Sequence, residues 1–331
     1  MAVPAERPRL NVGFVLTRRF TLAAYANFVD VLRLAADEGD RSRPIRCRWS
    51  VIGADRTPIP ASCGTRVEPD ALPDDPAQYD YVVVIGGLIG APQPDPALNA
   101  FLHRAAAAGV PLVGVCTGVF VLARAGLMAG RRCCVSWFHH DEFRAAFPRL
   151  EPVSDRIFVV DGDRLSCSGG VSAAHLAAFL VDRHIGRAAA RKALAIMMIH
   201  GPQGETHPQP GLPLELTTSD PLVSRALAAM QQRLDTPPTI AVLAGMLGVG
   251  RRRLERRFAA ALGLSPADAL LRLRLAQARL LLEEESRSIA QIADDTGFCD
   301  ASHLIRAFRA AHGETPDRWR QSRRRPTEEP A

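Results

Sequence analysis

The chain has 331 residues, which is long enough for two domains that each bury a core of their own. Its seven cysteines include no CxxC pair and no histidine–cysteine cluster at ligand spacing, which argues against a disulfide framework or a zinc site. The first residues lack the apolar core of a signal peptide. We therefore predict a cytoplasmic protein with reduced thiols and with no metal or other cofactor.

Strand-like and helical patterns alternate in the first part of the chain, after an N-terminus at 1–9 that we expect to be flexible. Apolar runs that predict buried strands occur at 10–16, 47–54, 81–86 and 112–115. Helical patterns separate several of them, notably at 21–36, 96–108 and 118–128. This alternation predicts an α/β domain with a mostly parallel sheet and helices on both faces.

One uncharged run, residues 105–123, is long enough to raise the question of a membrane span. Pro111 and three glycines divide this run into a helix end, a strand, a turn and a helix start. We therefore expect no contact between this protein and a membrane.

The turn within that run is Gly114-Val115-Cys116-Thr117-Gly118. A strand that ends in G-x-C-x-G and leads into a helix has the form of a nucleophile elbow, and it places the Cys116 thiol at a helix N-terminus. Gly86 and Gly87, which follow another strand, could supply main-chain N–H donors beside it. The spacing alone is equally compatible with an ordinary buried cysteine.

Residues 113–137, VGVCTGVFVLARAGLMAGRRCCVSW, are similar to the glutamine amidotransferase-like superfamily that includes PfpI-type proteases. They match the version that is fused to AraC-type domains in GlxA-like regulators. The resemblance spans about 10–198 and implies a flavodoxin-like, class I glutamine amidotransferase-like parallel-sheet sandwich. The ligand-binding residues that it implies are Gly87, Cys116, Thr117, Ser136 and Trp137.

Two departures from the enzymes of that superfamily concern catalysis. Ser136 stands where they have a histidine, and Ala24 stands where they have an acidic residue that contacts the cysteine. A cysteine nucleophile needs a base within hydrogen-bonding reach. His139, His140 and His175 could substitute, but lone histidines are more often structural or surface residues. We therefore predict a pocket that binds a ligand, without catalytic residues.

The predicted domains are an amidotransferase-like ligand-sensing domain at 10–200, a linker at 201–219 and a DNA-binding domain at 220–320. The linker begins with a stretch of prolines and glycines without periodicity, at 201–213. A helical pattern at 220–234 follows it. The tail at 321–331 is expected to be disordered.

The C-terminal domain contains one unit written twice, at about 240–263 and 289–313. The first helix of each unit repeats at a spacing of 49 residues, as in Ile240 and Ile289. The second helix repeats at a spacing of 50 residues, as in Phe258 and Phe308. Each copy combines a short helix, a turn with glycine and a second helix, which is the pattern of a helix-turn-helix.

The charge of this domain argues against a purely structural helical repeat. Residues 239–325 contain 16 arginines and 10 carboxylates, and this balance of +6 equals the formal charge of the whole chain. A basic surface that is confined to one domain is typical of a module that binds nucleic-acid phosphates.

Helical geometry selects the residues that we expect to contact DNA. With Leu254, Phe258, Leu304 and Phe308 directed inward, the opposite face of each second helix would enter the major groove. Arginine can contact guanine O6 and N7 with two hydrogen bonds, and Arg256 and Arg306 occupy equivalent positions. The predicted DNA-binding residues are Arg251, Arg252, Arg253, Glu255, Arg256, Arg257, Ala301, Ser302, His303, Ile305, Arg306 and Arg309.

The run IAQIADDTGFCDASHLIRAFRAAHGETPDRWR at 289–320 closely resembles the DNA-binding domain of AraC/XylS-type transcriptional regulators. That resemblance implies that both second helices reach successive major grooves of double-stranded DNA. It favours a one-component regulator whose first domain senses a small-molecule effector, for which relatives suggest an amino acid or a quaternary amine. We expect a homodimer, and a contact with RNA polymerase is compatible with this function.

The sequence leaves two alternative functions. One is a cysteine-dependent amidase or hydrolase that carries a DNA-binding domain, and the missing histidine and acid disfavour it. The other is a ligand-blind DNA-binding dimer, which the preserved elbow disfavours.

Overall fold

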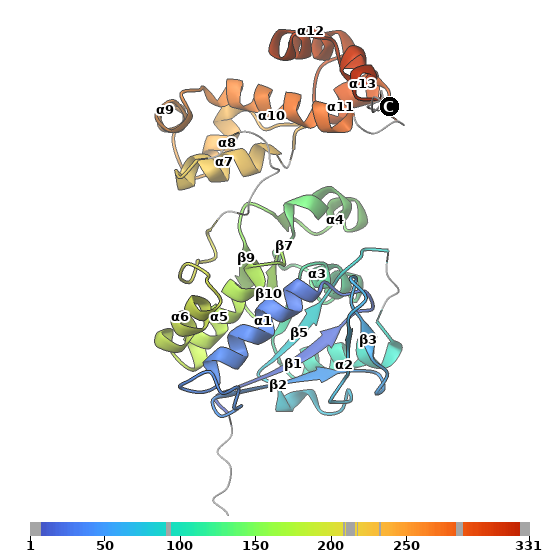
Figure 1. Ribbon diagram of the computed structural model, residues 1–331, viewed down its shortest axis with the longest axis vertical. Helices are drawn as coiled ribbons and strands as arrows, with labels where there is room; N and C mark the ends of the chain where they lie inside the picture. The colour runs from blue at the N-terminus through green and yellow to red at the C-terminus, as the bar shows by residue number, and fades with distance from the viewer. Residues whose placement is uncertain are drawn as a thin grey trace, which may run out of the picture. The chain divides into compact units, whose positions relative to one another are not determined.

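The computed structural model describes residues 8–90, 94–207, 209, 216, 218–231, 233–282 and 287–324. The chain forms two compact units, a first unit that ends at Gln209 and a second unit that begins at Pro210 (Figure 1). Each unit has hydrophobic cores of its own.

A six-stranded sheet with the order β2-β1-β5-β6-β10-β9 forms the centre of the first unit. All neighbouring strands are parallel except β9 and β10, which form an antiparallel pair at one edge. The mostly parallel sheet is as predicted, whereas the antiparallel edge strand was not. The strands are β1 (Leu10–Leu16), β2 (Cys47–Ile52), β5 (Tyr81–Ile85), β6 (Leu112–Val115), β9 (Phe158–Asp161) and β10 (Arg164–Cys167).

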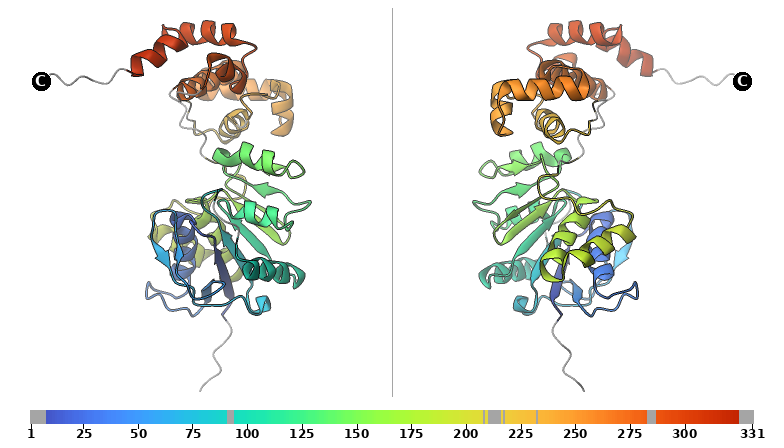
Figure 2. Two further views of the ribbon diagram at one scale, coloured as in Figure 1. Left: turned by 90° about the vertical axis from the view of Figure 1, so that its right-hand side faces the viewer. Right: turned by 90° about the vertical axis from the view of Figure 1, so that its left-hand side faces the viewer.

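Helices cover both faces of this sheet, because its central strands are apolar on both sides (Figure 2). Along β5, Val83 and Ile85 belong to one core and Val82 and Val84 to the other. The first core includes α1 (Leu22–Ala35), α5 (Ser172–His184) and α6 (Arg187–Ile196). The second includes α2 (Pro96–Ala107), α3 (Gly118–Arg124) and α4 (His140–Ala146).

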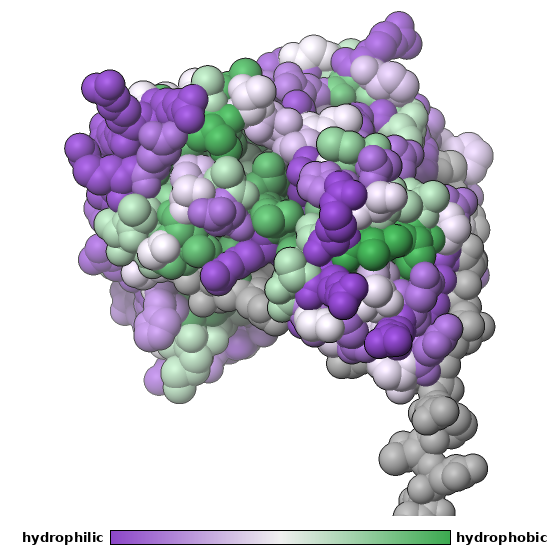
Figure 3. Space-filling view, turned by 90° about the horizontal axis from the view of Figure 1, so that it is seen from above, coloured by the Kyte–Doolittle hydropathy of each residue, from purple (hydrophilic) through white to green (hydrophobic). Residues whose placement is uncertain are grey.

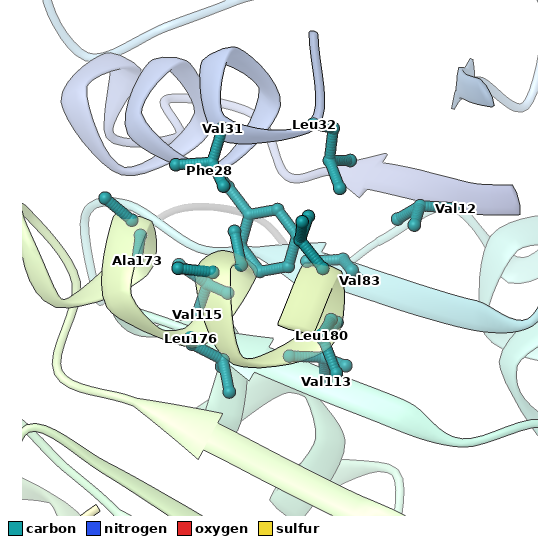
Figure 4. Close-up of a cluster of buried hydrophobic side chains, with 14 of the residues drawn as sticks. Val12, Phe28, Val31, Leu32, Val83, Val113, Val115, Ala173, Leu176 and Leu180 are labelled. Atoms are coloured by element: carbon teal, nitrogen blue, oxygen red, sulfur yellow. The ribbon is translucent and has the colours of Figure 1, made fainter. Parts of the chain in front are cut away.

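The first of these cores is shown in Figure 4. Phe28 and Val31 of α1 and Leu176 of α5 meet strand residues such as Val83 and Val113 there. These side chains are fully buried. The core therefore fixes α1 and α5 against β5 and β6, and β6 leads into the Cys116 turn. Short elements complete the unit: β3 (Ile59–Pro60), β4 (Arg66–Val67), β7 (Cys133–Cys134), β8 (Pro152–Val153), η1 (Pro76–Gln78) and η2 (Trp137–His139).

The first unit extends beyond the domain boundary predicted at residue 200. Gln203 N–H donates to His175 Nδ1 over 3.2 Å, and Ile157 N–H donates to the His207 carbonyl over 2.9 Å. Gln209 is 3% exposed. Residues of the predicted linker up to Gln209 thus belong to the first unit, since their polar groups bind its strands and helices.

The second unit consists of helices in its described ranges. Helices α8 to α9 form the first helix-turn-helix copy, α11 to α12 form the second, and α10 connects them. The helices are α7 (Pro221–Gln231), α8 (Ile240–Met246), α9 (Arg251–Leu262), α10 (Pro266–Leu281), α11 (Ile289–Asp295), α12 (Ala301–His312) and α13 (Pro316–Arg324). Residues 321–324 of the predicted tail are helical, and 325–331 lie outside the described residues.

Each helix-turn-helix copy has a separate core. Leu254 and Phe258 are fully buried in one, and Leu304 and Phe308 are fully buried in the other. Helix α10 contributes to both cores. Helices α9 and α12 each end at a left-handed glycine, a conformation that residues with a Cβ atom rarely adopt. In the described ranges, no helix combines the length and the apolar composition needed to cross a bilayer.

Candidate functional site

The Cys116 turn joins the end of β6 to the start of α3. Cys116 has a φ of +57°, a left-handed value that is uncommon for a residue with a side chain. A Cβ atom at Gly118 would lie 2.0 Å from the Val84 carbonyl oxygen, so only glycine fits there. The predicted sharp strand-to-helix turn is therefore present, and we call residues 114–118 the elbow.

Hydrogen bonds hold the elbow against neighbouring strands. Cys116 N–H donates to the Cys167 carbonyl over 3.1 Å. The Thr117 hydroxyl donates to the Gly87 carbonyl over 2.7 Å, and Thr117 is only 5% exposed. Gly86 N–H donates to Val115 O, so it is not available as the donor that we expected beside the thiol. The buried Thr117 side chain thus stabilises the elbow through its hydrogen bond to Gly87.

The Cys116 thiol is partly exposed and lies 3.6 Å from the Thr21 hydroxyl at the start of α1. A hydroxyl is not a base that could activate a thiol at neutral pH. Ala24, one turn further along α1, is fully buried and offers no carboxylate. The described partner of the thiol on this side is therefore a hydroxyl, and neither a carboxylate nor an imidazole.

The three histidines considered as substitute bases are bound elsewhere. His139 Nδ1 contacts the Glu142 carboxylate at 2.6 Å, and His140 Nδ1 contacts the Ser154 hydroxyl at 3.0 Å. His175 Nδ1 accepts a main-chain hydrogen bond from Gln203, and burial lowers the pKa of its ring. Among the described hydrogen bonds, none links these rings to the Cys116 thiol.

Ser136 and Trp137 come from a different segment than the rest of the predicted pocket. The Ser136 hydroxyl accepts a hydrogen bond from Phe138 N–H at the start of η2. Trp137 N–H donates to Gln209 Oε1 over 2.9 Å. Gly87, Cys116 and Thr117 are brought together at the elbow, whereas the described hydrogen bonds do not connect Ser136 or Trp137 to them.

Gln209 was missed by sequence analysis because an isolated glutamine in a Pro- and Gly-rich stretch resembles linker. Its Nε2 donates to the carbonyls of Val135 and Arg156, each over 2.8 Å, in addition to the bond from Trp137. One buried side chain thus binds the segment that carries Ser136 and Trp137 at the point where the first unit ends. No feature of the sequence would have indicated this contact.

The predicted DNA-contacting arginines of α9 differ in their partners. Arg252, Arg253 and Arg256 are exposed, and no carboxylate of the described residues pairs with them. Arg251 pairs with Glu255 at 2.8 Å, four residues along the same helix. Arg257 pairs with Asp220 at 2.6 Å, and this bond lowers the pKa of the Asp220 carboxyl. Arg257 is therefore engaged within the unit, which its prediction as a DNA-binding residue did not anticipate.

Helix α12 has fewer charges than α9, but its equivalent predicted DNA-contacting positions are also exposed or partly exposed. Ser302, Arg306 and Arg309 are exposed, while Ala301 and Ile305 are partly exposed. The His303 ring packs edge-on against Phe298, with centroids 5.1 Å apart. Apolar side chains also reach the surface of this unit, such as Val242 and Met246 of α8, each 55% exposed. Figure 3 shows hydrophobic patches between hydrophilic side chains on the face seen from above.

Comparisons with known proteins agree with this architecture. A DJ-1/PfpI family model matches residues 25–182, and a helix-turn-helix domain model matches residues 243–322. The HTH-type transcriptional regulator GbdR from Pseudomonas aeruginosa (strain UCBPP-PA14) is 34% identical over 96% of this chain and 86% of that protein. The chain therefore belongs to the helix-turn-helix transcriptional regulators that join a DJ-1/PfpI domain to an AraC-type DNA-binding domain.

A solved structure and an enzyme extend the comparison. The crystal structure of an AraC family transcriptional regulator from Pseudomonas putida covers 57% of this chain and 99% of its own, with a TM-score of 0.50 and 26% identity. Isonitrile hydratase from Pseudomonas putida is 33% identical over 50% of this chain and 67% of the enzyme. The flavodoxin-like fold predicted for the first unit is confirmed.

Proposed function

We propose that the first unit binds a small metabolite beside the Cys116 elbow and that this binding changes how the second unit engages double-stranded DNA. The observation that carries the proposal is the thiol environment. A strained, glycine-packed elbow presents a partly exposed cysteine to a threonine hydroxyl, while the three candidate histidines have other partners. The site thus has the backbone shape of a reactive centre, but its described side-chain groups, the Cys116 thiol and the Thr21 hydroxyl, suit ligand binding.

The effector is proposed to be a free amino acid or a quaternary amine. Thr21 is a suitable position for a substitution that blocks the site, because its side chain faces the thiol and makes no capping hydrogen bond to α1. A Thr21→Trp substitution would fill the space beside Cys116. Gel-shift titrations would use duplexes selected from a random library by the full-length protein, with a panel of amino acids and quaternary amines as probes.

We expect one probe to change the affinity of the wild-type protein for the selected duplex. Thr21→Trp should remove that change and leave the affinity without probe unaltered. Thr65→Trp, an exposed position before β4, is the matched control for a bulky addition to the first unit. A Thr21→Trp protein that still responds to the probe would place the sensing site elsewhere.

Gln209 is proposed to connect the effector site to the DNA-binding unit. A ligand changes an equilibrium only if it binds two states of the protein with different affinities. The Gln209 side chain joins the Ser136–Trp137 segment to the residue at which the first unit ends. A movement of that segment on ligand binding would therefore reach the start of the linker directly.

Gln209→Ala tests this connection, because it leaves two carbonyls and one N–H without their partner. We expect the effector response in the gel shift to fall while the affinity for the duplex without effector is kept. Gln203→Ala is the matched control, since its contact with His175 uses the main chain. An unchanged response in the Gln209→Ala protein would exclude this route and leave a dimer formed by the first unit as the coupling element.

A second candidate function is catalysis at Cys116, which the elbow geometry and the similarity to isonitrile hydratase favour. Our proposal expects no turnover of amides, esters, glutamine or isonitriles above the level of a Cys116→Ala control. A covalent acyl adduct on Cys116, detected by mass spectrometry of the intact protein, would falsify the binding-only assignment.

A further inference from the structure

A cavity of about 400 Å³ lies in the first unit, outside the elbow. It is lined by the end of β1, the turn after β2, the start of β3 and the N-terminal end of α2. None of the five predicted ligand-binding residues contributes to its walls. Its volume falls within the range of roughly 300–1,000 Å³ that small-molecule sites occupy. It also lies at the carboxyl ends of β1 and β2, the edge at which open parallel sheets bind ligands.

The walls of this cavity combine charges of both signs. Arg18, an exposed residue after β1, is the cationic group. Asp55 Oδ1 accepts a hydrogen bond from Thr57 N–H over 2.7 Å, and Asp95 Oδ1 accepts one from Ala97 N–H over 2.8 Å. The main chain therefore holds each carboxylate through one oxygen. The bond from Thr57 also lowers the pKa of Asp55, which keeps that group ionised at neutral pH.

The remaining walls are mostly apolar. Leu16 and Leu98 are 2% and 6% exposed and come from β1 and α2. Pro58, Ile59 and Pro60 close another side. A ligand that suits these walls carries one anionic group for the guanidinium, one cationic group for the carboxylates and a short apolar chain. The two carboxylates against one guanidinium exclude a simple anion as the preferred occupant.

We propose that this cavity is a second small-molecule site, which binds a zwitterion of free amino-acid size through Arg18, Asp55 and Asp95. The site is separate from the elbow but adjoins it along the chain. Thr17 and Arg18 line the cavity, and Thr21 approaches the Cys116 thiol. Between them, Arg19 has a φ of +61° and its carbonyl accepts Leu88 N–H. Occupancy of the two sites therefore has to be measured separately.

The experiment uses the full-length protein and three probes that share one apolar chain. L-Norvaline carries both charges, butylamine carries only the cation, and pentanoate carries only the anion. Binding would be followed by isothermal titration calorimetry and by saturation-transfer NMR, which detect millimolar affinities. We expect L-norvaline to bind at least tenfold more tightly than either single-charge probe, because butylamine leaves the guanidinium without a partner and pentanoate leaves both carboxylates without one.

Four variants locate the binding site. Arg18→Ala and Asp55→Asn should each weaken L-norvaline binding about tenfold or more. Both positions are exposed, and asparagine keeps an oxygen that can accept the Thr57 hydrogen bond, so neither change removes core packing. Arg48→Ala, an exposed arginine of β2 outside the cavity, is the matched control and should bind L-norvaline normally. Thr21→Trp should also bind it normally.

The proposal is overturned by three results. They are undetectable L-norvaline binding at millimolar concentration, equal affinity for all three probes, and normal binding by the Arg18→Ala protein. If Thr21→Trp alone abolishes binding, the probe occupies the elbow, which supports the proposed effector site and refutes the cavity. A loss confined to the Arg18 and Asp55 variants supports the cavity and leaves the proposed elbow function untouched.

Discussion

In the first helix-turn-helix copy, Leu254 and Phe258 are fully buried, and in the second copy Leu304 and Phe308 hold the equivalent places. The surfaces differ. Where α9 has Arg251, Glu255 and Arg257, the equivalent positions of α12 are Ala301, Ile305 and Ala307. The exposed positions of α8 are Ala241, Val242, Gly245 and Met246, whereas those of α11 are Ala290, Gln291, Asp294 and Asp295.

The two copies share the buried residues that the motif requires, and they differ in the charges on their surfaces. The extra charges Arg251, Glu255 and Arg257 of α9 are used in ion pairs within the unit. Arg256 and Arg306, in contrast, stand at equivalent positions, are exposed, and pair with no carboxylate of the described residues. We infer that this shared arginine contacts bases in both copies and that the ion-paired residues mainly support the fold of the first copy.

The largest expected effect concerns the two separate cores. Phe258→Ala and Phe308→Ala should each reduce the free energy of unfolding of their own copy by about 3–5 kcal/mol, since each removes a fully buried ring. Hydrogen–deuterium exchange on the full-length protein would localise the loss. We expect faster exchange in α8 and α9 for the first variant and in α11 and α12 for the second. Equal exchange throughout the unit in both variants would mean that α10 makes the two cores one cooperative body.

The next effect concerns DNA recognition. Arg256→Ala and Arg306→Ala should each weaken binding to a selected duplex by about 1–3 kcal/mol and affect random DNA less. Arg253 is also exposed, but it is not an arginine that both copies share. We expect Arg253→Ala to weaken both kinds of binding alike and to reduce the salt slope by about one unit. Salt-dependent gel-shift titrations distinguish the two classes. If all three variants lose specific and random binding equally, the assigned DNA-contacting face is wrong.

Local patterns in the sequence predicted the features that depend on neighbouring residues. The G-x-C-x-G spacing gave the elbow, and apolar periodicity gave the strands at 10–16 and 112–115 with the bounds that the structure has. Features that depend on distant residues were missed. The Arg257–Asp220 pair spans 37 residues, and Gln209 binds Val135 across 74. Hydropathy and charge report the tendency of a residue to be buried or exposed, but they do not identify its partner.

The smallest predicted effect tests whether Arg257 supports the fold. Arg257→Ala should leave the salt slope of DNA binding unchanged, in contrast to Arg253→Ala, because its guanidinium is bound to Asp220. The pair is partly exposed, so we expect only a small loss in the free energy of unfolding at pH 7. Urea unfolding followed by helical circular dichroism would measure it. A reduced salt slope would instead show that Arg257 leaves Asp220 and binds a phosphate.

The same pair predicts a dependence on pH. The hydrogen bond from Arg257 lowers the pKa of Asp220 in the folded protein, so the carboxylate stabilises the folded state above its unfolded pKa of about 4. That stabilisation is lost as the pH falls through the lower, folded pKa. The difference in unfolding free energy between wild type and Arg257→Ala should therefore be largest near neutral pH and shrink below about pH 4. Asp220→Asn also removes the capping carboxylate of α7, and its cost should shrink over the same range. A difference for Arg257→Ala that stays constant down to pH 2 would mean that the arginine stabilises α9 through packing of its aliphatic stem and not through the ion pair.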